Sequence, residues 1–448
     1  MTADGDSTGE DDPVPEDDWI VDADPVVDEG AFARDRRHGA TPERVRLAIR
    51  ESDPLPGGTG FGGYVDLADG TPALVRDVLG RVPVFVEATA ADPTADEAWA
   101  FDRRRLEEPR SVPAGTVLTA ADERRVWTLP DSRADAAAAA QAGVDEAIRE
   151  SIAAVDDAVA ADGNNATVAA DGNNATVAAD GHDTDAESDS GGDVAVAFSG
   201  GVDSGIVAAG APEAPCYVAG FEGCHDVAAA RTAAAAMDRE LREVRIDHDD
   251  LRAAIPTVAA ATGRTNPMDL AIAVPLYCTA RAAAADGHDR LLLGQGADEL
   301  FGGYSKVVEP ADDHRVDAGT VRGARDETMR TLPAQIERDV GAVRTAGIEP
   351  VTPLLADRVV AAALRLPGSL LATPDERKIA LRRAAEGLVP ESVRTAEKKA
   401  VQYGTYVSRE LDRLARQAGF KRRMDDHVER YVESVLLDSP PPEPVADE

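Results

Sequence analysis

Residues 193–204 read DVAVAFSGGVDS, and an apolar run continues to about Ala209. The apolar segment at 193–198 predicts a buried strand, and the residues after the two glycines predict a helix. A loop between the carboxyl end of a parallel strand and the next helix exposes backbone N–H groups, and the helix dipole adds partial positive charge. The stretch therefore predicts a strand–loop–helix unit that binds phosphate at the edge of a parallel sheet.

Five residues of this loop are candidates for the phosphate site: Ser199, Gly200, Gly201, Asp203 and Ser204. The glycines allow a ligand to approach the backbone closely, and the serine hydroxyls can donate hydrogen bonds. Asp203 alone would repel an anion, which points to a Mg²⁺ ion held there together with the phosphates. The loop lacks the lysine of the GxxxxGKS/T phosphate loop, and an ordinary tight turn is the alternative interpretation.

Short apolar segments alternate with alanine-rich segments between residues 193 and about 320. CYVAGF (216–221) and RLLLG (290–294) predict strands, whereas VAAARTAAAAM (227–237) predicts a helix. Strands that alternate with helices indicate an α/β fold with a doubly wound parallel sheet. Residues from about 320 to 436 are mostly helical by pattern.

The rest of the chain is organised differently. Short apolar runs broken by glycine and proline predict a small, strand-rich α+β domain, and two exact copies of DGNNATVAA predict a flexible linker. The predicted boundaries are a disordered acidic segment at 1–17, the strand-rich domain at 18–130, a helix at 131–161, the linker at 162–192, the α/β domain at 193–436 and an acidic tail at 437–448.

The composition limits the classes of function. Asp and Glu number 83 against 47 Lys and Arg, which gives a formal net charge of −36. Such a surface repels phosphate backbones and anionic lipids, so it disfavours nucleic-acid and membrane partners, and it is typical of adaptation to high salt. The 3 cysteines lack CxxC spacing, and no signal or membrane-spanning pattern occurs, which favours the cytoplasm.

A second motif, LLLGQGADELFGGY at 291–304, resembles the corresponding run of asparagine synthetases and their relatives, including β-lactam synthetases. The loop at 199–204 is similar to the pyrophosphate loop of ATP pyrophosphatases, so the resemblance implies an adenine nucleotide alpha-hydrolase-like fold that uses ATP. A strand that ends at 294 places Asp298 at the same sheet edge as Asp203, where the two carboxylates could share Mg²⁺. A solvated acidic helix start is the alternative for Asp298.

The resemblance implies roles for further residues. The positions where family members contact the nucleoside are Phe198, Ala219, Leu293 and Gly294. The catalytic candidates are Glu299, Lys378, Lys398 and Lys399. A lysine cation there neutralises charge that develops on the α-phosphate and on the acyl oxygen, and Lys399 is the first choice for this role. Only five lysines occur in the whole chain, which favours a chemical role for these three.

Three positions depart from the family pattern. Gln295 stands where many members carry glutamate, and an amide cannot take a proton from the attacking amine. Val351 and Ala356 stand at the Arg and Asp positions of a Glu-x-Arg-x-Pro-Phe-Leu-Asp segment, of which Glu349 and Pro353 remain. Adenylation is expected to survive the change at Gln295, whereas amide formation is expected to slow or to use another base or nucleophile; an ion pair at Val351 cannot form.

The segment at 60–118 resembles the glutaminase half of glutamine-dependent asparagine synthetases, notably in VRDVLGRVPVF (75–85) and EPRSVPAGTVL (108–118). The nucleophile of that family is an N-terminal cysteine whose own amine serves as the base. This chain starts Met1-Thr2, and its first cysteine is Cys216. We therefore expect a degenerate glutaminase-like domain, with nitrogen supplied by free ammonia, another amine or a separate amidotransferase partner.

The resemblance implies a cytoplasmic ligase that adenylates aspartate or a related carboxylate with ATP and Mg²⁺, releases pyrophosphate and lets ammonia or an amine displace AMP. Its partners are then small molecules, with a homo-oligomer as a further possibility. Three alternatives stay open: amide formation on a different carboxylate, a tRNA-modifying adenylation that the negative charge opposes, and a non-catalytic nucleotide-binding or regulatory protein.

Overall fold

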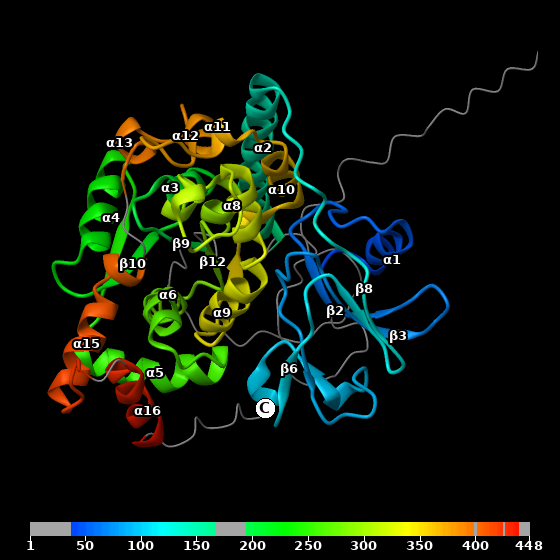
Figure 1. Ribbon diagram of the computed structural model, residues 1–448, viewed down its shortest axis with the longest axis horizontal. Coiled ribbons are helices and arrows are strands. Elements are labelled where there is room, and N and C mark those ends of the chain that lie inside the picture. The colour runs from blue at the N-terminus through cyan, green and yellow to red at the C-terminus, as the bar shows by residue number, and fades with distance from the viewer. Residues whose placement is uncertain (1–36, 166–193, 398–400, 424–425, 439–448) are drawn as a thin grey trace, which may run out of the picture.

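The computed structural model describes residues 37–165, 194–397, 401–423 and 426–438 (Figure 1). The blue and cyan segments before helix α2 (Ala137–Asn165) gather on one side of Figure 1, and the green to red segments gather on the other. We call residues 37–130 the front region and residues 131–438 the rear region. The predicted acidic lead-in lies outside the described residues, as do most of the predicted linker and tail.

The front region contains two antiparallel sheets, one in the order β1-β2-β3-β7-β8 and one in the order β5-β4-β6. The strands are β1 (Arg37–Gly39), β2 (Phe61–Asp66), β3 (Pro72–Arg76), β4 (Phe85–Glu87), β5 (Trp99–Ala100), β6 (Pro109–Ser111), β7 (Thr116–Leu118) and β8 (Glu123–Arg125). Tyr64 and Leu74 of the first sheet form a buried cluster with Val86 and Trp99 of the second. Alternate strand residues thus pack the sheets together, as the strand period of two requires.

The rear region is built on five parallel strands in the order β11-β10-β9-β12-β13. The strands are β9 (Val194–Ala197), β10 (Cys216–Gly220), β11 (Leu241–Arg245), β12 (Arg290–Leu292) and β13 (Glu349–Val351). This confirms the predicted α/β class with a parallel sheet. The predicted strands at 193–198, 216–221 and 290–294 are present, and β9 is the central strand.

Helices surround this sheet. They are α3 (Val202–Ala209), α4 (His225–Ala236), α5 (His248–Thr262), α6 (Pro267–Ala285), α7 (Ala297–Phe301), α8 (Val321–Met329), α9 (Leu332–Arg344), α10 (Asp357–Leu364), α11 (Gly368–Leu371), α12 (Ile379–Ala384), α13 (Glu391–Arg394), α14 (Val401–Gly404), α15 (Val407–Gln417) and α16 (His427–Asp438); α1 (Pro42–Glu51) belongs to the front region. Val194 of β9 lies in one buried cluster with Ile206 of α3, whereas its neighbour Ala195 clusters with Ala280 of α6. Both faces of the sheet are therefore covered.

Two elements differ from the sequence prediction. β13 was not predicted, because Pro350 at its centre cannot donate a hydrogen bond to a sheet; the structure places this strand at the sheet edge, where proline is tolerated. α2 extends to Asn165 and so includes the first residues of the repeated nonamer, which were predicted to be linker. The helix continues into the repeat because the sequence before it is rich in alanine, the residue with the highest helix propensity.

Among the described residues, α6 is long and apolar enough to span a membrane by length and composition. Half of its most apolar window is buried inside the protein, where the helix packs on the parallel sheet. We interpret α6 as a core helix.

Buried ion pairs join the front and rear regions. Arg81 of the front region lies with its Nη1 2.6 Å from Asp357 Oδ1 of α10 and its Nε 3.0 Å from Asp77 Oδ1. All three side chains are at most 3% exposed. Arg76, also buried, places Nη1 3.0 Å from Glu337 Oε2 of α9. Charges buried this deeply remain ionised only when they are paired, so these contacts fix the two regions against each other.

Candidate functional site

The candidate site lies at the carboxyl end of β9, the strand from which the chain adds neighbours on both sides of the sheet. The chain passes from β9 to β10 on one side and later returns to β12 on the other side of β9. Loops that leave the carboxyl ends of such strands diverge and form a crevice, the usual ligand site of open α/β sheets. The two sequence motifs follow β9 and β12, so this topology brings them to the same edge.

The loop after β9 has the conformation that its glycines predict. Gly200 has a φ of +76°, and a Cβ added there would lie 2.6 Å from the carbonyl oxygen of Ala229. Ser204 Oγ accepts a hydrogen bond from the Ser199 backbone N–H at 3.2 Å, which closes the loop over the start of α3. Only glycine fits at position 200, and α3 directs its amino end towards the crevice.

The loop after β12 packs directly against this loop. A Cβ added to Gly294 would lie 3.0 Å from the Asp203 backbone, so glycine allows the two loops to approach closely. The nucleoside candidates Phe198, Ala219 and Leu293 are at most 4% exposed, as members of the core. Their side chains therefore pack in the core and are not available to a ligand.

The structure brings Asp203 and Asp298 together through Lys378. The Lys378 ammonium lies 2.6 Å from Asp203 Oδ2 and 2.7 Å from Asp298 Oδ1. The Lys378 side chain is 12% exposed, Asp203 20% and Asp298 43%, so the cluster is open to solvent on the Asp298 side. Three residues from distant segments thus form one charged centre at the carboxyl edge of the sheet.

Lys378 is held as a cation in an unusual backbone conformation. Burial disfavours the charged ammonium, but the Asp203 and Asp298 carboxylates outweigh this effect and raise the pKa of Lys378 above its ordinary value. Its φ of 56° lies in the left-handed region, which residues other than glycine rarely adopt. Strained backbone of this kind persists where surrounding contacts determine it, and it concentrates at functional sites.

Glu299 lies directly beside this centre but is buried. Its side chain accepts a hydrogen bond from the Tyr304 hydroxyl at 2.5 Å. Burial, reinforced by the neighbouring Asp298 carboxylate, raises the pKa of Glu299 to about 7. Glu299 can therefore exchange a proton near neutral pH, as a general acid or base must.

Gln295, in the loop after β12, is held by a carboxylate of α9. Its side-chain amide donates a hydrogen bond to Asp339 Oδ2, and Asp339 is also paired with Arg338, whose Nε lies 2.7 Å from Asp339 Oδ1. Arg338 reaches further to Asp269 Oδ1 at 2.9 Å. The sequence motif did not predict this link, because Gln295 and Asp339 lie 44 positions apart.

The departures at Val351 and Ala356 have different consequences. Val351 lies in β13, where its carbonyl oxygen accepts the hydrogen bond of the Leu293 N–H at 2.8 Å, so the position keeps a structural role through its backbone. Ala356 cannot form an ion pair, but the next residue, Asp357, pairs with Arg81. The sequence contains a signal for this contact: Asp357 lies one position after the place where the family pattern has aspartate.

Two candidates cannot be placed: Lys398 and Lys399 lie outside the described residues. The segment just before them is anchored, since Arg382 Nη2 donates to the carbonyl oxygen of Ala396 at 3.2 Å.

The histidines after β10 and β11 form no metal cluster: in the ranges that the structure describes, no group of three or more His, Cys, Asp or Glu side chains is arranged to bind a metal ion.

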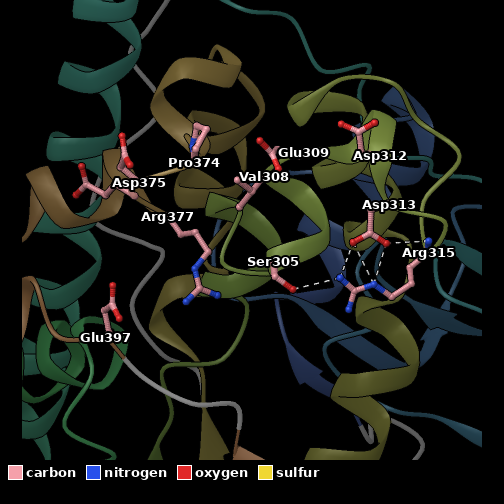
Figure 2. A pocket seen from close by; sticks show the side chains of 11 residues that line it. Ser305, Val308, Glu309, Asp312, Asp313, Arg315, Pro374, Asp375, Arg377 and Glu397 are labelled. Carbon is pink, nitrogen blue, oxygen red and sulfur yellow. Dashed lines mark hydrogen bonds and ion pairs between the residues drawn. The ribbon is translucent and has the colours of Figure 1, made fainter.

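An acidic cleft of about 440 Å³ is lined by residues of the segments 305–315 and 374–377 and by Glu397 (Figure 2). Its lining includes six carboxylate side chains, together with Ser305 and Arg377. Arg377 Nη1 donates to the carbonyl oxygen of Gly303 at 2.7 Å, and Figure 2 shows Arg315 directed at Asp313 and Ser305. The carboxylates would repel a triphosphate, so this cleft is not where we expect a nucleotide to bind.

Comparisons with known proteins give two findings. The family model described as asparagine synthase matches residues 185–327 and 314–439. The glutamine-hydrolyzing "Putative asparagine synthetase 1" of Methanocaldococcus jannaschii is 27% identical over 279 residues, which cover 54% of this chain and 51% of that protein. The chain thus spans about half the length of the curated relative that it matches.

Proposed function

The chain belongs to the asparagine synthase family, and from this premise we propose that it is an ATP-dependent, amide-forming ligase. It adenylates the side-chain carboxylate of aspartate, or of a related substrate, and releases pyrophosphate; ammonia or an amine then displaces AMP. The observation that carries this proposal is the meeting of Asp203, Lys378 and Asp298 beside the loop after β9.

ATP is proposed to lie along the loop after β9. Gly200 and Gly201 immediately precede α3, and the start of a helix favours an anion, so their backbone N–H groups and the Ser199 hydroxyl are proposed to bind the phosphates; Ser204 Oγ accepts a hydrogen bond from the Ser199 N–H and is proposed to keep the loop in place. The adenosine would lie against the backbone of Phe198, Ala219, Leu293 and Gly294. A doubly wound sheet of the adenine nucleotide alpha-hydrolase type belongs to this proposal, and the central position of β9 supports it.

Asp203 and Asp298 fit a magnesium ion. Mg²⁺ is usually bound by one or two carboxylates together with substrate phosphates, and these two carboxylates are already gathered around one cation. Bound there, Mg²⁺ would neutralise charge on the β- and γ-phosphates as pyrophosphate leaves.

Lys378 and Glu299 are proposed to act on the reacting groups. The Lys378 ammonium can stabilise negative charge on the phosphate and acyl oxygens, and Lys398 and Lys399 are proposed to add further positive charge. Glu299, with its pKa raised to about 7, can accept a proton from the attacking amine. Gln295 cannot serve as this base, and its contact with Asp339 supports a positioning role instead.

The front region is proposed to be a glutaminase-like domain that does not hydrolyse glutamine, with its boundary near residue 130. No cysteine occurs before Cys216, so the front region offers no thiol nucleophile. Free ammonia, an amine or a separate amidotransferase then supplies nitrogen. A cytoplasmic location, suggested by the cysteine pattern, and adaptation to high salt, suggested by the net charge of −36, belong to the same proposal.

A second candidate function is a non-catalytic, nucleotide-binding regulatory protein. Gln295 favours it, because the amide replaces a side chain that could act as a base. Within the ligase class, the alternative is amide formation on a carboxylate other than aspartate.

The experiment supplies ATP, Mg²⁺ and aspartate in molar KCl, with either ammonia or glutamine, and measures pyrophosphate and asparagine. We expect turnover with ammonia and none with glutamine, a loss of about a hundredfold in Asp203→Asn, and unchanged turnover in the exposed control Asp69→Asn. ATP binding without turnover on any amino acid would favour the regulatory alternative. Turnover in Gln295→Glu but not in the unaltered chain would place the loss at the amide-forming step.

A further inference from the structure

The ammonium of Lys378 occupies the place between two carboxylates where a cation is needed. It contacts Asp203 Oδ2 and Asp298 Oδ1 at 2.6 and 2.7 Å. The two carboxylates carry a charge of −2, and one ammonium reduces it to −1. The chain itself thus supplies one of the two positive charges that the pair of carboxylates needs.

The fold holds Lys378 in this place from both ends. Its backbone adopts the left-handed conformation with a φ of 56°. Its side chain passes over Gly303, where an added Cβ would lie 2.3 Å from Lys378 Cε and 1.8 Å from Asp298 Oδ1. The absence of a side chain at residue 303 therefore makes room for the ion pair.

A divalent cation and the ammonium would compete for the same oxygens. Carboxylate oxygens are the protein ligands that Mg²⁺ prefers, and two cations at one pair of carboxylates repel each other strongly at short range. A triphosphate changes this balance, because its negative charge gives the displaced ammonium a new partner.

We propose that Lys378 is a built-in counter-ion that keeps divalent metal out of the Asp203–Asp298 pair until a nucleotide binds. The inference rests on the proposed metal role of these two aspartates. Metal and nucleotide then enter together, since each favours the state in which Lys378 has left the carboxylates. The device would prevent the centre from being filled by metal alone.

The test is the binding of Mn²⁺ to the full-length chain without nucleotide, measured by electron paramagnetic resonance at constant KCl. Lys378→Met is expected to bind Mn²⁺ at least about tenfold more tightly than the unaltered chain, a change of ~1.4 kcal/mol. Lys421→Met removes an exposed lysine from elsewhere in the rear region and is expected to leave the affinity unchanged. Lys378→Arg keeps the cation and should bind as weakly as the unaltered chain.

Further variants separate the possible failures. Asp298→Asn combined with Lys378→Met is expected to lose the gain, and Lys378→Gln replaces Lys378→Met if circular dichroism shows that the latter does not fold. Equal affinity in the unaltered chain and in Lys378→Met overturns the counter-ion role and leaves the proposed function intact. If Mn²⁺ binds to no variant, even with a non-hydrolysable ATP analogue present, the metal role itself is wrong and this inference falls with it.

Discussion

Among single residues, Gly303 is decisive for the charged centre, because the lack of a side chain at this position leaves room for the ion pair. Lys378 and Asp298 meet above Gly303, and a methyl group on that residue would overlap both of them. The φ of Gly303 is not in the left-handed region, so alanine there would act through steric overlap alone. A matched control is Gly143 of α2, where an added Cβ has no neighbour within 4 Å.

We expect Gly303→Ala to displace both Lys378 and Asp298 and to lower pyrophosphate release by at least about tenfold, because neither side chain is then positioned for the nucleotide and its metal. Its melting temperature should also fall, since overpacking of a closed contact costs about 1–3 kcal/mol. Gly143→Ala should keep full activity. Equal activity in the two variants would show that the contact is not needed.

The three cysteines of the chain are buried, and we expect their thiols to have low reactivity. Burial raises the pKa of both Cys216 and Cys278 to about 11 and also raises that of Cys224. The thiolate is the reactive form, so a raised pKa leaves less of it at pH 8. We expect Ellman's reagent to react slowly with the folded chain, faster as the pH rises towards 11, and at once with 3 thiols in denaturant. Rapid reaction of the folded chain at pH 8 would contradict this assignment.

At the scale of elements, the loop between β9 and α3 is positioned by its contact with α4. Gly200 and Gly223 both have positive φ, 76° and 70°, but only Gly200 packs against backbone, that of Ala229 and Ala230. Gly223 has open space around it. The two glycines therefore separate the cost of strain from the cost of a displaced loop.

Gly200→Ala is expected to weaken the binding of an ATP analogue by at least about tenfold, or ~1.4 kcal/mol, because the loop must move away from α4 and its N–H groups lose their alignment. Gly223→Ala carries the same backbone strain and should bind the analogue normally. Isothermal titration calorimetry of both variants makes the comparison. Similar losses in both would assign the effect to strain rather than to loop position.

Much of the parallel sheet could be predicted from the sequence, because its signals are local. The strand and loop at 193–204 and the motif at 291–304 each contain their own glycines and apolar runs. β13 could not be predicted, since Pro350 interrupts its pattern. The resemblance named Lys378 as a catalytic candidate, but its contact with Asp203 could not be predicted, because the two residues lie 175 positions apart. The contact between Gln295 and Asp339 also joins distant positions.

At the scale of the whole molecule, the front region is tied to the rear region by buried charge. Arg81 pairs with both Asp77 and Asp357, and Arg76 pairs with Glu337 on α9, the helix whose Asp339 accepts a hydrogen bond from Gln295. Removing one partner of a buried ion pair leaves an uncompensated charge and is strongly destabilising. The two regions are therefore expected to unfold together.

Arg81→Met is expected to lower the free energy of unfolding by about 3 kcal/mol and to uncouple the regions. Trp99 and Trp127 lie in the front region, whereas most helices lie in the rear region, so tryptophan fluorescence and far-ultraviolet circular dichroism report on different parts. In urea the two signals should change together in the unaltered chain and separately in Arg81→Met. Arg110→Met, which removes an exposed pair with Glu123, should change stability by less than about 1 kcal/mol. Separate transitions in the unaltered chain would refute the coupling.

In the proposed reaction, a substrate carboxylate attacks the α-phosphorus of ATP at the centre formed by Asp203, Lys378 and Asp298. The most direct measurement uses aspartate labelled with ¹⁸O in its side-chain carboxylate, incubated with the protein, ATP, Mg²⁺ and ammonia in molar KCl, followed by mass spectrometry of the nucleotide and phosphate products. Adenylation moves one carboxylate oxygen to the phosphorus of AMP. We therefore expect AMP that carries ¹⁸O and pyrophosphate that does not. Labelled orthophosphate with ADP, or amide formation with unlabelled AMP, would contradict it.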